Sequence, residues 1–256
     1  MRLGPGIERH VLLPLARSLV YATREDLIPE FSKYGSVLAE TIAGASVAGV
    51  TEPSPSQEAL DDAGVASCLE WTRNAYLVVG KQEPGVVFDS LVAASALGLA
   101  RYNTRFQEAY DKSVKDSVGW LSFTHALTFA NAVHDMCVHD PEYWPAGLLQ
   151  MACFVGRNHS YQDLARVTDE WVVEDPEPFF DESRELLLDH RMRDPIFSSH
   201  LAKTTVAVRR EHAISTPGTG ELVLVGLNLF LHAPIKQKHA RRLARQAIDL
   251  VARDHE

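Results

Sequence analysis

Three histidines of this sequence occupy positions from which their imidazole rings could share one chemical site. The chain has eleven histidines in 256 residues. Of these, His125, His159 and His200 each lie in a different segment with helical periodicity, on the side that carries apolar residues. Residues spaced by whole helical turns share one side of a helix. The apolar neighbours at such spacings are Leu121, Phe129, Ala132, Leu148, Ala152, Val155, Ile196, Phe197 and Val208.

A group of neutral imidazoles on inward helix faces is a metal-binding arrangement. Imidazole nitrogen binds iron, zinc and copper, and three protein ligands leave a coordination position open for substrate or dioxygen. The sequence therefore predicts a metal centre at His125, His159 and His200, with His232 in reserve. Iron is the expected ion, and zinc, copper or no metal are the alternatives. The residues expected to position a substrate are Asn131, Tyr161 and Lys203.

The competing interpretation is structural. Each of the three histidines would then be a core residue whose ring is hydrogen-bonded to a backbone carbonyl or a hydroxyl group. The pattern of residues leaves both interpretations open.

Other catalytic signatures are missing from the sequence. It contains no P-loop and no glycine-rich dinucleotide fingerprint after a strand. It also lacks the G-x-S-x-G nucleophile motif, the H-E-x-x-H zinc motif and the paired E-x-x-H motifs of di-iron bundles. The histidines thus remain the main chemical signal.

The elements that must position these histidines are expected to be helices. No segment alternates in the manner of a β-strand, and apolar residues recur at helical spacing along the whole chain. The sequence predicts an all-α fold, a single multi-helix bundle forming one domain over 1–256, with the loop 49–56 as a candidate boundary. Further loops are expected at 174–178 and 215–220. The roughly eleven expected helices cover 7–22, 23–43, 57–79, 86–99, 115–139, 145–156, 161–173, 183–191, 195–212, 221–232 and 235–253.

The composition narrows the expected partners and location. Hydrophobic residues make up 46% of the chain, charged residues 23%, and the formal net charge is −9. This balance lacks the basic footprint of nucleic-acid binding or of anionic membranes, so neither partner is expected. The three cysteines, Cys68, Cys137 and Cys153, lie far apart in apolar helical sequence and are expected to be free thiols. With no signal peptide recognised, a cytoplasmic location is expected. The oligomeric state is left open.

Two short motifs resemble those of a known group of proteins. Thr124-His-Ala-Leu-Thr-Phe-Ala-Asn-Ala132 and Ser199-His-Leu-Ala-Lys-Thr-Thr205 resemble the histidine motifs of the questin oxidase-like family and of related helical domains fused to Rieske ferredoxins. The segment 15–30 looks like the opening of those Rieske-associated domains. The resemblance implies an all-α oxidative enzyme acting on cyclic or aromatic carbonyl compounds, with His125 and His200 functional.

The sequence departs from that group in two respects. The expected helix 86–99 carries no histidine, where the family has a histidine-rich motif. The Rieske pattern of Cys-x-His and Cys-x-x-His is also missing, so a Rieske-type electron donor would have to be a separate chain.

The leading hypothesis is a helical oxidoreductase, a metal-dependent oxygenase with non-haem iron held by histidines, acting on a small cyclic or aromatic carbonyl compound. One alternative is a non-enzymatic helical module that binds a small ligand or acts as a scaffold for a redox partner. Another is a haem-oxygenase-like bundle in which one histidine is an axial ligand. The metal hypothesis requires the ring nitrogens to lie within about 3–4 Å of one another, since ligands sit roughly 2.1 Å from one ion.

Overall fold

The computed structural model describes residues 12, 29–44, 60, 64–108, 118–188 and 195–233. Within these residues the chain is helical and has no β-strand, only an isolated bridge between Tyr102 and Gln162. The all-α prediction is therefore confirmed for this part of the chain. Its α-helices are α2 (Tyr34–Ala43), α3 (Val65–Ala75), α4 (Pro84–Ala100), α5 (Trp120–His139), α6 (Trp144–His159), α7 (Pro176–Leu188), α8 (Pro195–Ile214) and α9 (Pro217–His232).

Eight α-helices thus lie in the described residues, where the sequence predicts roughly eleven for the whole chain. The predicted helix 235–253 and the candidate boundary 49–56 lie outside the described residues, as does 7–22 apart from Leu12. The described residues also contain short helical turns. These are 3-10 turns at Pro29–Phe31, Thr104–Glu108, Pro141–Tyr143 and Asp169–Trp171, and a π-helical turn at Tyr76–Gly80.

Helix α4 is the centre of the packing. It contacts α5, α6 and α9, and every residue from Ser90 to Ala100 is buried. A helix enclosed by others needs no polar face, which explains its continuous run of alanine, serine, glycine and larger apolar residues. Its small side chains allow close approach: a Cβ built on Gly226 of α9 would lie 3.0 Å from the Ala96 carbonyl oxygen.

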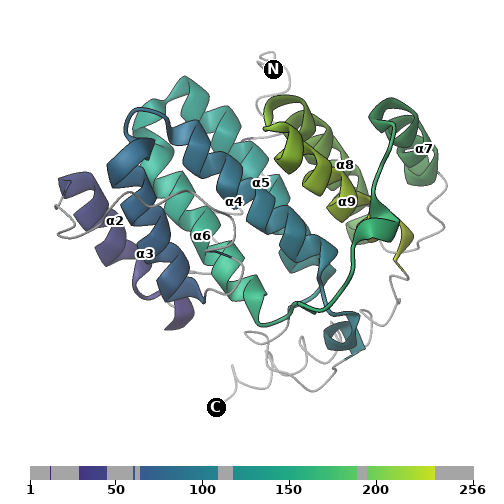
Figure 1. Cartoon of the computed structure of the whole chain (residues 1–256), viewed down its shortest axis with the longest axis horizontal. Coiled ribbons are helices and arrows are strands. Elements are labelled where there is room, and N and C mark those ends of the chain that lie inside the picture. The colour runs from purple at the N-terminus through teal and green to yellow at the C-terminus, as the bar shows by residue number, and fades with distance from the viewer. Residues whose placement is uncertain are drawn as a thin grey trace.

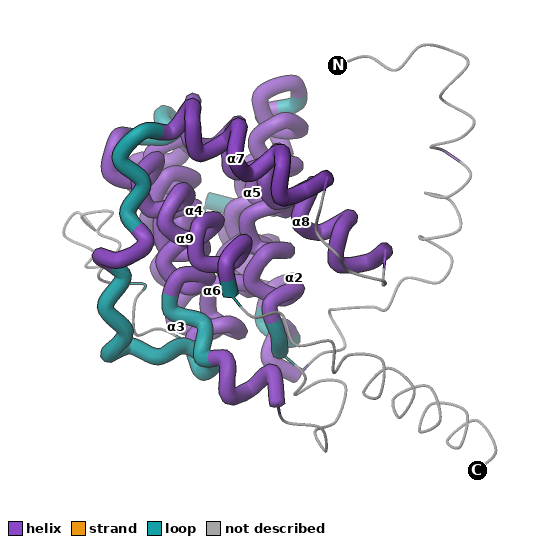
Figure 2. Tube along the Cα trace, turned by 90° about the vertical axis from the view of Figure 1, so that its right-hand side faces the viewer, coloured by secondary structure: helices purple, strands orange, loops and turns teal. Residues whose placement is uncertain are grey.

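The helices lie side by side from one end of the molecule to the other, although not in chain order, since α6 lies between α3 and α4. Figure 1 shows α2 and α3 at one end, α7 at the opposite end, and the remaining helices between them. In the perpendicular view of Figure 2, α8 lies beside α5, and α7, which packs on α8, lies on the side that faces the viewer. None of the described helices combines the length and apolar character needed to cross a membrane.

The prediction of a helix over 161–173 is wrong. This segment is an irregular loop that carries only the 3-10 turn Asp169–Trp171. Its backbone is held by the segment at the end of α4, because Asn103 N–H donates to the Tyr161 carbonyl (2.9 Å) and Asp163 N–H donates to the Arg101 carbonyl (2.7 Å). The Asp163 carboxylate also accepts from Ala165 N–H at 3.2 Å. Such local bonds offer the backbone an alternative to the helix.

Two helices begin earlier than the sequence predicts. The residues expected as loops at 174–178 and 215–220 contain the first turns of α7 and α9, which begin at Pro176 and Pro217. Proline fits a first helical turn because its missing N–H has no helical acceptor there.

The start of α9 is capped by a residue of α4. The carboxylate of Asp89 accepts hydrogen bonds from Thr216 N–H (3.0 Å) and from the hydroxyls of Thr216 (2.8 Å) and Thr219 (2.7 Å). A carboxylate also suits the positive end of the helix dipole. The cap therefore joins two helices that are more than a hundred residues apart in sequence.

Removal of this cap should destabilise the fold measurably. The Asp89→Ala variant is expected to lose about 0.5–2 kcal/mol of unfolding free energy, the usual effect of deleting a helix cap. Urea denaturation followed by circular dichroism measures the loss. Asp89→Asn, which keeps an acceptor oxygen, should lose less. An Asp89→Ala protein as stable as the wild type would contradict this account of α9.

Candidate functional site

His125 of α5 and His200 of α8 face one another directly. Their Nε2 atoms lie 2.8 Å apart, and the ring centroids are separated by 4.9 Å at an interplanar angle of 44°. At this distance one Nε2 donates a hydrogen and the other accepts it. The sequence predicts a metal site of three histidines, and the structure places two of them, His125 and His200, in contact.

Packing of α5 against α8 holds the two rings at this place. The neighbours of His125 on the inner side of α5, Thr124 and Leu127, are buried, while His125 itself is half-buried. His200 is only 9% exposed. The pair therefore lies at the edge of the core, screened from most but not all of the solvent.

Burial also sets the protonation of His125. It lowers the pKa of this imidazole to about 4, with smaller contributions from the nearby Lys203 ammonium and from His200. Burial disfavours the charged form, and a neighbouring cation acts in the same direction. His125 is consequently neutral at neutral pH, with a nitrogen lone pair available as a base or a ligand.

A groove of about 530 Å³ lies between α5 and α8 beside the pair. Its walls include Thr128, one turn after His125, and Lys203, one turn after His200, while the two rings themselves are not among the lining residues. Residues on one helix face follow at such spacing. Most of the other lining is apolar. The lining residues are Thr128, Asn131, Ser199, Ala202, Lys203, Val206 and Ala207.

Of the three residues predicted to position a substrate, Asn131 and Lys203 line this groove. The amide of Asn131 is already engaged: its Nδ2 donates to Glu211 Oε1 at 2.8 Å, and its Oδ1 accepts from Arg210 at 3.2 Å. Arg210 also pairs with Asp135 at 2.7 Å. Asn131 is therefore held in one orientation, so it shapes the groove wall more than it offers free hydrogen-bonding groups.

Glu211 is a site residue that the sequence analysis missed. It is fully buried, and burial raises the pKa of its carboxyl group, partly offset by the hydrogen bond from Asn131. The sequence did hold a signal, because Glu211 is eleven residues after His200 and Thr204 lies between them at helical spacing. A carboxylate on the same inward face as a candidate histidine is unusual enough to be noted.

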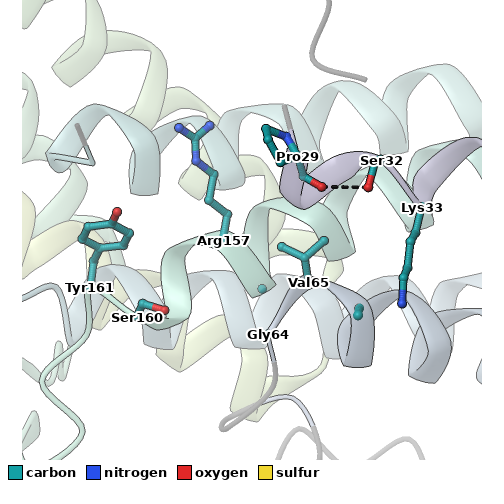
Figure 3. Close-up of a pocket in the computed structure, with 10 residues that line it drawn as sticks. Pro29, Ser32, Lys33, Gly64, Val65, Arg157, Ser160 and Tyr161 are labelled. Atoms are coloured by element: carbon teal, nitrogen blue, oxygen red, sulfur yellow. Dashed lines mark hydrogen bonds between the residues drawn. The ribbon is translucent and has the colours of Figure 1, made fainter. Parts of the chain in front are cut away.

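His159 and Tyr161 lie elsewhere. His159 is the last residue of α6, and Tyr161 lines a second pocket of about 440 Å³ at the start of α3. Figure 3 shows Tyr161 and Ser160 at one end of this second pocket and Lys33 at the other, with Arg157 between them. No lining residue is common to the two pockets.

The three histidines do not form one cluster. Within the described residues, no group of three or more His, Cys, Asp or Glu side chains is placed to hold a metal ion. The reserve ligand, His232, is exposed at the end of α9, where its Nδ1 lies 3.0 Å from the Asn228 carbonyl oxygen and its ring stacks on Trp171. The structure thus brings together His125 and His200 alone among the predicted ligands.

The lowered pKa of His125 predicts a pH dependence of stability. Between pH 6.5 and about 4 the unfolded histidine binds a proton that the folded one does not, so the unfolding free energy should fall as the pH falls through this window. Urea denaturation at several pH values measures the slope. His125→Gln should flatten this part of the curve, whereas His232→Gln should leave it unchanged. Equal slopes for wild type and His125→Gln would contradict the prediction.

Comparison of this chain with protein-family models, curated proteins and solved structures finds no match in any of the three.

Proposed function

We propose that this chain is an enzyme that acts on a small carbonyl compound bound in the α5–α8 groove, with His125 and His200 as an acid–base pair. The observation that carries the proposal is the 2.8 Å approach of the two Nε2 atoms, on the two helices whose next turns line the groove. Because the imidazoles share one hydrogen, the pair holds a proton donor and a proton acceptor side by side.

The chemistry that suits such a pair is proton transfer next to a carbonyl group. The ring that donates the shared hydrogen keeps a lone pair on its Nδ1 and can remove a proton from the carbon beside the carbonyl, and the ring that accepts it carries its own hydrogen on Nδ1 and can protonate the carbonyl oxygen. Positioned acids and bases of this kind accelerate reactions by about 10²–10⁴-fold. The low pKa of His125 keeps it neutral at neutral pH, and a neutral imidazole can accept a proton, but the same shift makes it a weaker base.

The groove walls favour a compact apolar ring as the substrate. Ala202, Val206 and Ala207 supply apolar surface on α8, and binding sites for small molecules combine such surface with a few placed polar groups. The polar residues that line the groove are Thr128, Asn131, Ser199 and Lys203.

A second candidate function is the metal-dependent oxidoreductase expected from the sequence. Two ligands at about 2.1 Å from one ion and at right angles to each other are roughly 3.0 Å apart, close to the separation of the two Nε2 atoms. An ion replacing the shared hydrogen would take its other ligands from water or substrate. The questin oxidase-like resemblance and the iron stay predictions. The haem alternative is less favoured, because the Nε2 atom of each histidine faces the other ring and is not open to a haem iron.

One experiment separates these functions. Purified protein is incubated in D₂O with a cyclic ketone such as cyclohexanone, and deuterium exchange beside the carbonyl is followed by NMR, with and without a chelator. Exchange that survives chelation supports the acid–base pair. About one equivalent of bound metal and loss of activity on chelation support the oxidoreductase. A protein with neither exchange nor metal would contradict both.

A further inference from the structure

We propose that Glu211 is a pH-sensitive switch in the packing of α8 against α5. It binds a proton in the native fold, and loss of this proton loosens α8 beside the groove. Glu211 does not line the groove itself, but it is hydrogen-bonded to Asn131, which does. The switch goes beyond the proposed function, because it does not depend on which ligand the groove binds.

The two carboxyl oxygens of Glu211 lie in the interior of the bundle. The side chain is fully buried, and Oε1 accepts a hydrogen bond of 2.8 Å from Nδ2 of Asn131 on α5. Oε2 is also buried and has no hydrogen-bond partner among the described residues. A buried carboxylate needs donors or a cation to offset its lost hydration. Because Oε2 has neither, this environment favours the neutral carboxylic acid.

The nearest charged groups act in opposite directions on Glu211. Burial raises the pKa of its carboxyl group, and the carboxylates of Asp135 on α5 and Asp89 on α4 raise it further. The Arg210 guanidinium on α8 lowers this pKa, but it already pairs with Asp135 at 2.7 Å. A neighbouring charge of the same sign disfavours ionisation of a carboxyl group. Arg210 therefore does not supply Glu211 with a partner of its own.

The other titratable groups on the surrounding helices are engaged elsewhere or exposed. Burial lowers the pKa of His134 on α5, so this ring is neutral at neutral pH. His212, next to Glu211 on α8, has its Nδ1 at 3.2 Å from a carbonyl oxygen at the start of α9. Between α7 and α8, the pair Arg209–Glu177 is exposed (58% and 76%). In the described part of the chain, no ion pair joins any of these groups to Glu211.

Ionisation of Glu211 therefore acts on the packing of α8. The carboxylate can gain donors only from water, so α8 must move away from α5 at this residue. The hydrogen bond to Asn131 crosses the two helices that form the groove, and this movement breaks it. A carboxyl group whose pKa is raised in the folded state stabilises the fold at low pH, and that contribution is lost as the pH rises through the folded pKa.

The pH dependence of stability tests the switch. Urea denaturation gives the unfolding equilibrium constants of the full chain and of Glu211→Gln at several pH values, and their ratio cancels contributions common to both, such as that of His125. The ratio of wild type to variant should rise about tenfold per pH unit above about 4.3, until Glu211 ionises in the folded state. The same ratio for Glu221→Gln, at an exposed glutamate on α9, should stay constant. A ratio for Glu211→Gln that is constant, or falls as the pH rises, would overturn the proposal.

Infrared spectroscopy of the wild type tests the proton even if Glu211→Gln does not fold. Native protein near neutral pH should show the carbonyl stretching band of one protonated carboxyl group, and thermal unfolding should remove it. When a higher pH removes the band, backbone amides of α8 should exchange hydrogen faster in the wild type than in Glu211→Gln at the same pH, as mass spectrometry measures. Native protein without the band would overturn the bound proton. Equal exchange in the two proteins after the band is lost would overturn the loosening of α8.

Discussion

The Gly156→Ala variant is expected to lose about 1–3 kcal/mol of unfolding free energy, the usual cost of overpacking a tight interior site. At this residue α6 crosses the start of α3 so closely that a Cβ would lie 2.5 Å from both the Cα and the backbone nitrogen of Val65, and 2.8 Å from the carbonyl carbon of Gly64. These are backbone atoms, so no side-chain rotation relieves the contact. The helices must separate instead.

The opposing term is the preference of helices for alanine over glycine, which is about 1 kcal/mol at most. Gly35→Ala is the matched control, because nothing lies within 4 Å of a Cβ built at that position in α2. Its unfolding free energy should be unchanged or slightly raised. Urea denaturation of both variants gives the comparison. A Gly156→Ala protein as stable as Gly35→Ala would show that α3 and α6 do not approach at Gly156.

Substitution at the histidine pair should have the largest effect on catalysis. His200→Gln is expected to slow deuterium exchange into the ketone by about 10²–10⁴-fold, the contribution of a positioned acid or base. Glutamine can still hydrogen-bond to His125 but cannot transfer a proton at neutral pH. The rate is measured by NMR under the conditions of the wild-type assay.

The two histidines act as one unit in this scheme, so their effects should not add. The double variant His125→Gln with His200→Gln should be about as slow as either single variant, as for other catalytic groups that depend on each other. His232→Gln, at an exposed histidine on α9, is the control and should keep the wild-type rate. If the fold-reductions in exchange rate of the two single variants multiply in the double variant, the two rings act separately.

Local patterns in the sequence were sufficient for most helices of the described chain. Helix α5 ends at His139, as the following Asp140–Pro141 pair predicts. Elements that depend on distant partners were not predictable in this way. The cap of α9 comes from Asp89, 127 residues before Thr216, so the stretch around Pro217 reads as a loop. The segment after Tyr161 has apolar residues at helical spacing, but its backbone bonds to the end of α4 instead.

The site shows the same division between local and distant information. Helical spacing correctly indicates that His125 and His200 lie towards the interior, but it does not identify the helix that each will meet. The two residues are 75 positions apart and meet because α5 packs on α8. His159 satisfies the same local criterion, yet it lies at the end of α6 and joins no metal-binding group in the described residues. Glu211 was not predicted, because carboxylates are rarely buried.

The packing of α4 against α9 has a consequence for how the chain folds. These helices span residues 84–100 and 217–232, so their contacts close a loop of more than a hundred residues. Closing such a loop costs chain entropy before any contact is gained, and proteins rich in distant contacts fold more slowly than those with local ones. The Asp89 cap can form only after this closure. Helix α9 should therefore acquire its first turn late, when α4 is already in place.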